Sequence, residues 1–263
     1  MMAEDILSRI VEKKKAEVAT SQARLPEAEL RNSIQADREK RPFLKQFELP
    51  GVNIIAEIKR ASPSKGDICP GLDPAIYASA YEQGGAAALS VLTDETFFKG
   101  SAEDLKKARA ATTLPVLRKD FLISEYQFYE SAVLGADAVL LIVRILSQTQ
   151  LGDYLKLCEE LNLDALVEVH SEKEIEAASQ AGARLVGINN RNLRSFETNI
   201  ETAARMVSFL EPHQIPIAES GIRSRSDIEA LGNSGIHNFL IGESLVRASS
   251  PKDFLQSLIH GAA

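Results

Sequence analysis

One unit recurs along most of the chain: a short apolar run, a polar turn, and a segment with helical spacing. The apolar runs cover residues 52–59, 86–93, 114–120, 137–143, 164–169, 184–189, 215–220 and 237–242. They begin roughly 20 to 35 residues apart, which leaves room for a helix between consecutive strands. Runs that are apolar on both faces are typical of parallel strands covered by helices. Eight such units are the number that closes a barrel.

The segments between the runs carry start and stop signals for helices. "DPAIYASAYEQGG" (73–85) opens with Asp-Pro, an N-cap followed by proline in the first turn, and closes on glycine. Segments 124–136, 147–163, 171–183 and 224–235 follow the same rule. A doubly wound sheet would carry GxGxxG after its first strand, and a solenoid would keep a constant period. We therefore expect an α/β protein with a single (β/α)8 TIM barrel over residues 51–263.

Residues 1–50 precede the first apolar run and do not fit the repeat. Apolar residues at helical spacing on a charged segment predict a first helix. Its stripe consists of Ile6, Leu7, Ile10, Val11 and Val18. "PEAELRNSI" (26–34) predicts a second, short helix. We expect an N-terminal helical extension that either covers one end of the barrel or helps to close an active site.

Composition excludes several classes of partner. The 263 residues have a formal net charge of -7, and no basic cluster marks a nucleic-acid or polybasic membrane surface. The N-terminus lacks the apolar core of a secretory signal, and no apolar run approaches the roughly 20 residues of a membrane span. The two cysteines form no CxxC pair, which favours free thiols in a reducing compartment. We expect a cytoplasmic protein, most simply a monomer, with association to other enzymes left open.

In a barrel of this kind, the chemistry lies at the C-terminal ends of the strands and in the loops that follow. The polar or glycine residues at those ends are Glu57, Lys59, Lys119, Asp120, Glu168, Asn189, Arg191, Glu219, Ser220, Gly221, Gly242, Glu243 and Ser244. Any one of them alone would more often be a solvated residue or a member of a structural ion pair. Because closure of the barrel brings them to one face, we expect a catalytic site there. The four histidines look isolated and indicate no metal site.

Two glycine motifs and a set of apolar residues predict what this site binds. "ESGI" (219–222) and "IGESL" (241–245) follow the seventh and eighth runs, where barrels of this kind frequently bind phosphate. Glycine lets the backbone approach an anion, and the free N–H groups of a helix start point at it. Four apolar residues near the same face could surround a flat aromatic ring: Phe98, Phe121, Leu140 and Leu193.

Taken together and in this order, the motifs resemble those of the indole-3-glycerol phosphate synthase family over residues 50–245. They are "IIAEIKRASPSKG", "SVLTDETFFKGS", "VLRKDF", "GADAVLLIV", "LVEVH", "GINNRNL", "AESGI" and "FLIGESL". The resemblance implies a small phosphosugar–anthranilate substrate, 1-(2-carboxyphenylamino)-1-deoxyribulose 5-phosphate. It is converted to indole-3-glycerol phosphate with loss of CO2 and water, in tryptophan biosynthesis. No metal and no organic cofactor is implied.

The resemblance also implies roles for individual residues. Lys119 corresponds to the general acid and Glu168 to the general base. The catalytic set is completed by Glu57, Lys59, Asn189 and Ser220. Substrate-lining positions correspond to Ser62, Phe98, Phe121, Leu140, Arg191, Leu193 and Glu219, and the phosphate site to Lys59, Gly221, Gly242 and Glu243. One departure is Asn192, where the family frequently has Asp; it affects a loop contact.

Three points stay open at the level of sequence. Spacing does not decide whether Lys59 or Lys119 gives the first proton. A lysine at the end of a barrel strand could instead form a Schiff base with a ketone, as in an aldolase. A barrel that binds a phosphosugar without catalysis is the remaining alternative, although both Glu57 and Glu168 are present.

Overall fold

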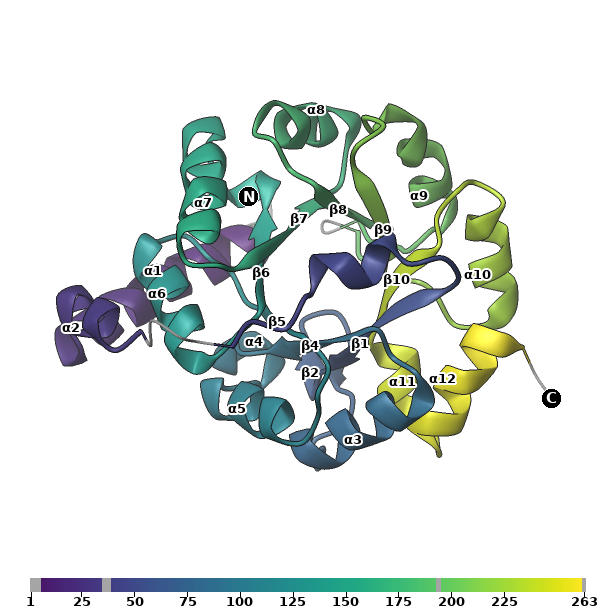
Figure 1. Cartoon of the computed structure of the whole chain (residues 1–263), viewed down its shortest axis with the longest axis horizontal. Helices are drawn as coiled ribbons and strands as arrows, with labels where there is room; N and C mark the ends of the chain where they lie inside the picture. The colour runs from purple at the N-terminus through teal and green to yellow at the C-terminus, as the bar shows by residue number, and fades with distance from the viewer. Residues whose placement is uncertain (1–5, 35–38, 193–194, 262–263) are drawn as a thin grey trace.

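The computed structural model describes residues 6–34, 39–192 and 195–261 of the chain. Eight parallel strands form a closed barrel in the order β1-β10-β9-β8-β7-β6-β5-β4, as Figure 1 shows. The strands are β1 (Asn53–Ile58), β4 (Ala88–Leu92), β5 (Val116–Lys119), β6 (Ala138–Ile142), β7 (Asp164–Val169), β8 (Leu185–Asn189), β9 (Ile215–Glu219) and β10 (Asn238–Ile241). Each predicted apolar run contains one of these strands, so the predicted (β/α)8 barrel is confirmed.

Helices surround the barrel on its outside (Figure 1). They are α3 (Pro74–Gly84), α4 (Glu95–Phe98), α5 (Ala102–Ala110), α6 (Glu125–Leu134), α7 (Gln148–Glu160), α8 (Glu172–Gln180), α9 (Glu201–Met206), α10 (Arg225–Gly232), α11 (Glu243–Arg247) and α12 (Pro251–His260), with short 3-10 turns η2 (Val143–Ile145) and η3 (Val207–Phe209). The predicted caps are confirmed for α3, where the Asp73 carboxylate accepts from two backbone N–H groups and Gly85 adopts a φ of 89°. None of the described helices is long and apolar enough to cross a membrane.

Alternation along each strand separates two cores. On β1, Ile54, Ala56 and Ile58 pack in the layer between the barrel and the helices. Ile55 points the other way and packs with side chains inside the barrel. Glu57 shares the inward face of Ile55, because the two residues are two positions apart on the strand. A charged residue in this apolar strand therefore points at the barrel axis.

The N-terminal extension closes the barrel at the end where the strands begin. The 3-10 turn η1 (Leu44–Glu48) crosses that end, in the foreground of Figure 1. Leu44 N donates to the Asp164 carboxylate at the start of β7 (2.9 Å), and Asn238 of β10 donates to the Phe47 carbonyl (3.4 Å). Phe43 and Phe47 are buried edge to face, 5.1 Å apart. The extension is thus a plug for this end, in agreement with the first of the two interpretations.

The extension also supplies two helices on the side of the barrel. The predicted helices are confirmed as α1 (Ile6–Arg24) and α2 (Glu27–Asn32). Both contact α6, and Figure 1 shows them at one edge of the molecule. Tyr126 of α6 fixes α1 by donating to the carbonyls of Ser21 and Leu25 (3.2 Å each).

A small hairpin follows β1 and was not predicted. Strands β2 (Ala61–Ser62) and β3 (Gly66–Asp67) pair antiparallel around a turn that Lys65 N closes on the Ser62 carbonyl (3.2 Å). Two-residue strands show no alternation, so hydrophobic pattern cannot reveal them. The hairpin places Ser62 and Ser64 above the end of β1.

Candidate active site at the C-terminal end of the barrel

A cavity of about 380 Å³ opens at the C-terminal ends of the strands. It is lined by all the described residues that the sequence assigned to catalysis, substrate or phosphate: Glu57, Lys59, Ser62, Phe98, Lys119, Phe121, Leu140, Glu168, Asn189, Arg191, Glu219, Ser220, Gly221, Gly242 and Glu243. Leu193 lies outside the described residues. Asp120 and Ser244, noted as polar strand-end residues, also line it.

Lys119 is the central cation of the cavity. It ends β5, and its Nζ lies 2.7 Å from Glu219 Oε2 at the end of β9 and 3.2 Å from Glu168 Oε2 on β7. Burial by itself would lower the pKa of Lys119, but the two carboxylates outweigh it and hold the pKa above the usual range. The side chain is therefore an ammonium at neutral pH.

The two carboxylates beside Lys119 differ in their protonation. Burial opposes ionisation of Glu168, yet Lys119 and the neighbouring His170 bring its pKa down to about 2. Asn189 Nδ2 also donates to Glu168 Oε1 (3.1 Å) and favours the charged form. Burial raises the pKa of Glu219 to about 7, because repulsion from Glu168 offsets the attraction of Lys119. One ammonium thus serves two carboxylates, of which one readily keeps a proton.

Glu57 and Lys59 form a second ion pair at the rim of the cavity. Glu57 points inward from β1, and Lys59 follows the strand directly. Gly242 lies against the pair, since a Cβ at this position would overlap the Glu57 carboxylate. Gly187 on β8 plays the same part for Glu219, whose Oε1 occupies the space of a Cβ. These two glycines let carboxylates from neighbouring strands lie flat across the backbone.

Aromatic and aliphatic side chains line one side of the cavity. The rings of Phe98 and Phe121 lie 6.0 Å apart at an interplanar angle of 37°. Leu140 of β6 packs in the same cluster. Leu7 and Ile10 of α1 join it and line the cavity, so the extension also contributes to the site. The extension thus contacts both ends of the barrel: η1 closes one end, and α1 forms part of the cavity wall at the other.

Strained backbone and glycine residues form the side of the cavity opposite these apolar side chains. Ser220 has a φ of 66° and Gly221 a φ of 86°, so two consecutive residues adopt the left-handed region. For a non-glycine residue this costs on the order of 1–3 kcal/mol, and such strain concentrates at functional sites. Gly221 is also required sterically, because a Cβ would overlap the Thr198 side chain. On the next strand, Gly242 precedes α11, whose first residue is Glu243.

Arg191 connects three loops over the cavity. Its guanidinium donates to Ser64 Oγ in the β2–β3 hairpin (3.0 Å) and to Thr198 Oγ1 (3.3 Å). It also forms a 3.8 Å ion pair with Glu243. Asn189 Oδ1 accepts from Arg191 N (3.0 Å). Because the same Asn189 side chain donates to Glu168, it links Arg191 to that carboxylate.

Comparison with known proteins decides the family. The sequence model described as indole-3-glycerol phosphate synthase matches residues 7–258. The chain belongs to the indole-3-glycerol phosphate synthase family. Among curated relatives, the indole-3-glycerol phosphate synthase of Desulfosudis oleivorans is 57% identical over 97% of this chain and 98% of its own. That of Syntrophobacter fumaroxidans is 52% identical over 97% of each chain.

Solved structures with similar coordinates share the fold alone. A thiamine phosphate pyrophosphorylase from Pyrococcus furiosus matches with a TM-score of 0.59 and 15% identity, covering 79% of this chain and 93% of its own. A mandelate oxidase variant with (S)-mandelic acid matches with a TM-score of 0.59 and 14% identity, covering 78% of this chain and 69% of its own. Both support the barrel architecture and carry no argument about chemistry.

The expectation that His170 is isolated is wrong. It lies in the loop after β7, as expected, but only 4% of its side chain is exposed. Its Nε2 lies 3.3 Å from Glu168 Oε1 and its Nδ1 3.4 Å from Glu174 Oε2. Two spacings could have revealed it: Glu-x-His across the end of a strand, and His four residues before a Glu in the first turn of a helix. Across residues 6–34, 39–192 and 195–261, no group of three or more His, Cys, Asp or Glu side chains could hold a metal ion.

Proposed function

We propose that the chain converts 1-(2-carboxyphenylamino)-1-deoxyribulose 5-phosphate into indole-3-glycerol phosphate, with loss of CO2 and water, in tryptophan biosynthesis. The protein is thus a carbon–carbon carboxy-lyase, as its family membership supports. The observation within the site that carries the proposal is the Lys119 ammonium between Glu168 and Glu219. An acid and a base stand there side by side, in a cavity that has one apolar and one glycine-lined side.

The two sides of the cavity suit the two ends of the substrate. The apolar side, with Phe98, Phe121 and Leu140, takes the anthranilate ring, because flat aromatic surface is buried best against such side chains. The phosphate is assigned to the backbone at Gly221, Gly242 and Glu243. Loops after the last two strands frequently bind phosphate in this fold, and Lys59 supplies a cation beside them.

Ring closure needs an acid. The ring carbon that bears the carboxylate attacks the ketone carbon, and the electron pair of the C=O bond moves onto oxygen. Lys119 stabilises this negative oxygen and donates a proton to it. The raised pKa of Lys119 does not prevent the transfer, because an alkoxide is far more basic than the amine of the lysine that gives up the proton. CO2 then leaves, and the electrons of its bond restore the aromatic ring.

Dehydration needs an acid and a base. The new hydroxyl takes a proton and leaves as water, while Glu168 removes a proton from the ring nitrogen or a neighbouring carbon. The low pKa of Glu168 keeps it in the ionised form that a base must have. Asn189 and Ser220 are assigned to orient the reacting groups, and Glu219 and Arg191 to hold the substrate. Lys59, paired with Glu57, is the second candidate for the first proton.

The decisive experiment is incubation of the protein with the synthetic substrate while indole fluorescence is recorded. Fluorescence that grows with enzyme concentration, with release of one CO2 per product, is the expected result. Substrate that stays intact would overturn the proposal and leave a binding barrel without catalysis. Borohydride added with substrate tests the aldolase alternative: covalent trapping on Lys119 or Lys59 would support a Schiff base.

We further propose that the chain acts as a cytoplasmic monomer, with residues 1–50 as an extension of a barrel domain at 51–263. One observation supports the location: Cys69 and Cys158 are both free thiols, as expected for a reducing compartment. Light scattering during size-exclusion chromatography tests the oligomeric state, and fractionation of the producing cells tests the location.

A further inference from the structure

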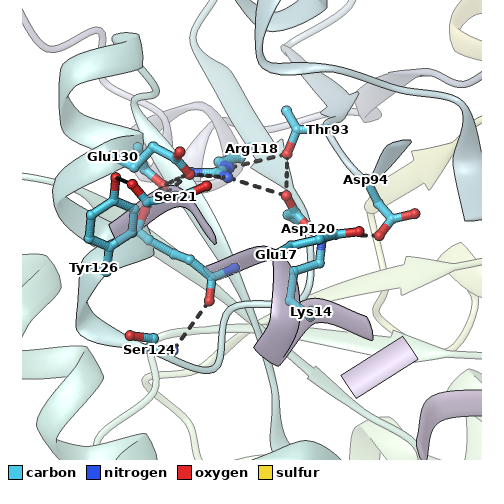
Figure 2. A network of polar contacts seen from close by, with 12 residues as sticks. Lys14, Glu17, Ser21, Thr93, Asp94, Arg118, Asp120, Ser124, Tyr126 and Glu130 are labelled. Atoms are coloured by element: carbon cyan, nitrogen blue, oxygen red, sulfur yellow. Dashed lines mark hydrogen bonds and ion pairs between the residues drawn. The ribbon is translucent and has the colours of Figure 1, made fainter. Parts of the chain in front are cut away.

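A lysine of the N-terminal extension is buried in an ion-pair network against the barrel (Figure 2). Lys14 lies on the inner face of α1, and only 6% of its side chain is exposed. Its Nζ lies 2.9 Å from Asp120 Oδ1, 3.0 Å from Asp94 Oδ2 and 2.8 Å from Glu17 Oε2. Asp94 and Asp120 are almost completely buried. The ammonium therefore joins α1 to the loops after β4 and β5.

Asp120 connects this network to the proposed acid. It follows Lys119 directly, and its Oδ1 accepts from the Phe121 backbone N–H (2.8 Å). Its Oδ2 accepts from Thr93 Oγ1 (2.6 Å) and from Arg118 (3.3 Å). The Asp120 side chain thus has four partners, and Lys14 is the one among them that comes from outside the barrel strands and their loops. The same Asp120 oxygen, Oδ1, contacts both the Lys14 ammonium and the backbone N–H of Phe121.

The same helix forms part of the cavity wall. Leu7 and Ile10 precede Lys14 by seven and four residues, which is about two turns and one turn of α1. All three face the barrel together with Val18. Leu7 and Ile10 pack in the cluster of Phe121 and Leu140 and line the cavity. Because a helix is rigid over this distance, the anchor at Lys14 sets where the two apolar side chains lie.

Electrostatics make the anchor specific. Burial of an unpaired ammonium is unfavourable, and here the ion pairs with two buried carboxylates offset this cost. Burial would lower the pKa of Lys14, but Asp120 and Asp94 raise it above its usual range. Burial would raise the pKa of Asp120, but Arg118 and Lys14 bring it down to about 2. An apolar residue at position 14 would remove the ammonium that neutralises the buried carboxylates of Asp94 and Asp120.

We propose that Lys14 is a positioning residue for the ring-closure reaction. Through Asp120 it holds Lys119 and Phe121 in register, and through α1 it holds Leu7 and Ile10 against the substrate ring. This inference rests on the proposed function, because the positioned groups are those assigned to acid catalysis and to the anthranilate ring.

The test compares Lys14→Met with Lys15→Met. Methionine keeps much of the length of lysine and removes the charge. Lys15 is the neighbouring residue of α1, with 61% of its side chain exposed and one ion pair to Glu12, and it serves as the matched control. For each variant, kcat and KM are measured with the synthetic substrate, and values are corrected for the folded fraction measured by circular dichroism.

We expect Lys14→Met to lower kcat by about 10- to 100-fold, since a displacement of about 1 Å at a catalytic group has costs of this order. Lys15→Met stays within twofold of wild type. Inhibition by 2-aminobenzoate, a probe of the aromatic side, weakens in Lys14→Met, whereas inhibition by inorganic phosphate is unchanged. A general loss of structure would weaken both inhibitors alike, so this split separates positioning from stability.

A second variant covers the case in which Lys14→Met does not fold. Lys14→Met with Asp94→Asn removes one cation and one anion, which restores the charge balance but still leaves Asp120 without its ammonium. We expect this double variant to fold and to keep the lowered kcat. Wild-type kcat in either comparison, per folded molecule, would overturn the inference. Failure of the wild-type protein itself to turn over the substrate would instead overturn the proposed function, so the two failures are distinguishable.

Discussion

Lys119 Nζ lies 2.7 Å from Glu219 Oε2 and only slightly farther, 3.2 Å, from Glu168 Oε2, so that one cation holds two carboxylates of the same cavity. The arrangement divides their protonation. Glu168 is stabilised as an anion, and Glu219 is shifted towards its neutral form. A site with one ammonium, one anion and one carboxyl near its titration point has the groups that successive proton transfers need.

Lys119→Met tests the assignment of the acid. We expect kcat to fall by about 10²- to 10⁴-fold, the usual contribution of a general acid, while the protein stays folded. The matched control is Lys156→Met, whose side chain is 75% exposed on α7. Steady-state kinetics with fluorescence detection measure both variants. Turnover by Lys119→Met within tenfold of wild type would transfer the role to Lys59.

Glu168→Gln tests the assignment of the base. The amide keeps the size of the side chain but accepts no proton, so dehydration slows while ring closure continues. We expect a cyclised intermediate, heavier than the product by one water, to accumulate and kcat to fall roughly 10²-fold. Rapid quenching with mass spectrometry detects the species, and Glu172→Gln at the exposed start of α8 is the control. If only unreacted substrate remains, Glu168 acts in ring closure instead.

Glu219 gives the protein a predictable pH dependence of stability. Its folded pKa of about 7 lies above the ordinary value of 4.5, so the folded protein binds more protons than the unfolded chain between these values. The contribution of neutral Glu219 is therefore complete below pH 4.5 and is lost as the pH rises through 7.

Between pH 5 and pH 8, the free energy of unfolding of the wild type should decrease because of Glu219. In Glu219→Gln we expect this decrease to be smaller by at least about 1 kcal/mol. Urea unfolding at each pH measures this difference. Glu229→Gln, at an exposed position of α10, should reproduce the wild-type curve. Parallel curves for Glu219→Gln and wild type would mean that Glu219 titrates in its ordinary range.

Gly187→Ala should damage the site without touching a polar side chain. The new methyl group would occupy the place of Glu219 Oε1 and push the carboxylate away from Lys119. We expect kcat to fall by about tenfold or more, as for a small displacement of a positioned group. Gly152→Ala in α7 is the control, because no atom lies within 4 Å of its Cβ position, and removing a helical glycine stabilises by up to about 1 kcal/mol. Equal kcat values in both variants would contradict the prediction.

Much of the fold could be predicted because its signals are local and periodic. Each apolar run is a strand, and each Ser- or Asp-capped segment is a helix, since burial on both faces and N-capping depend on residues close in sequence. The candidate site followed from one rule of the fold, that the strand ends of a closed barrel meet at one face. The β2–β3 hairpin was not predicted, because strands of two residues are too short to show an alternating pattern.

The sequence by itself determined which residues reach the mouth of the barrel, but it did not decide their partners. Lys119 is 49 residues from Glu168 and 100 from Glu219, and the distance between their atoms depends on strand order and register. Lys14 stood in a run of three lysines typical of a solvated helix face, and it is buried because α1 packs where Asp94 and Asp120 meet. Alternation and capping act over a few residues, whereas ion pairs across the barrel form only after closure has brought distant strands together. For that reason only the tertiary structure assigned Lys119 its two carboxylates and Lys14 its place beside them.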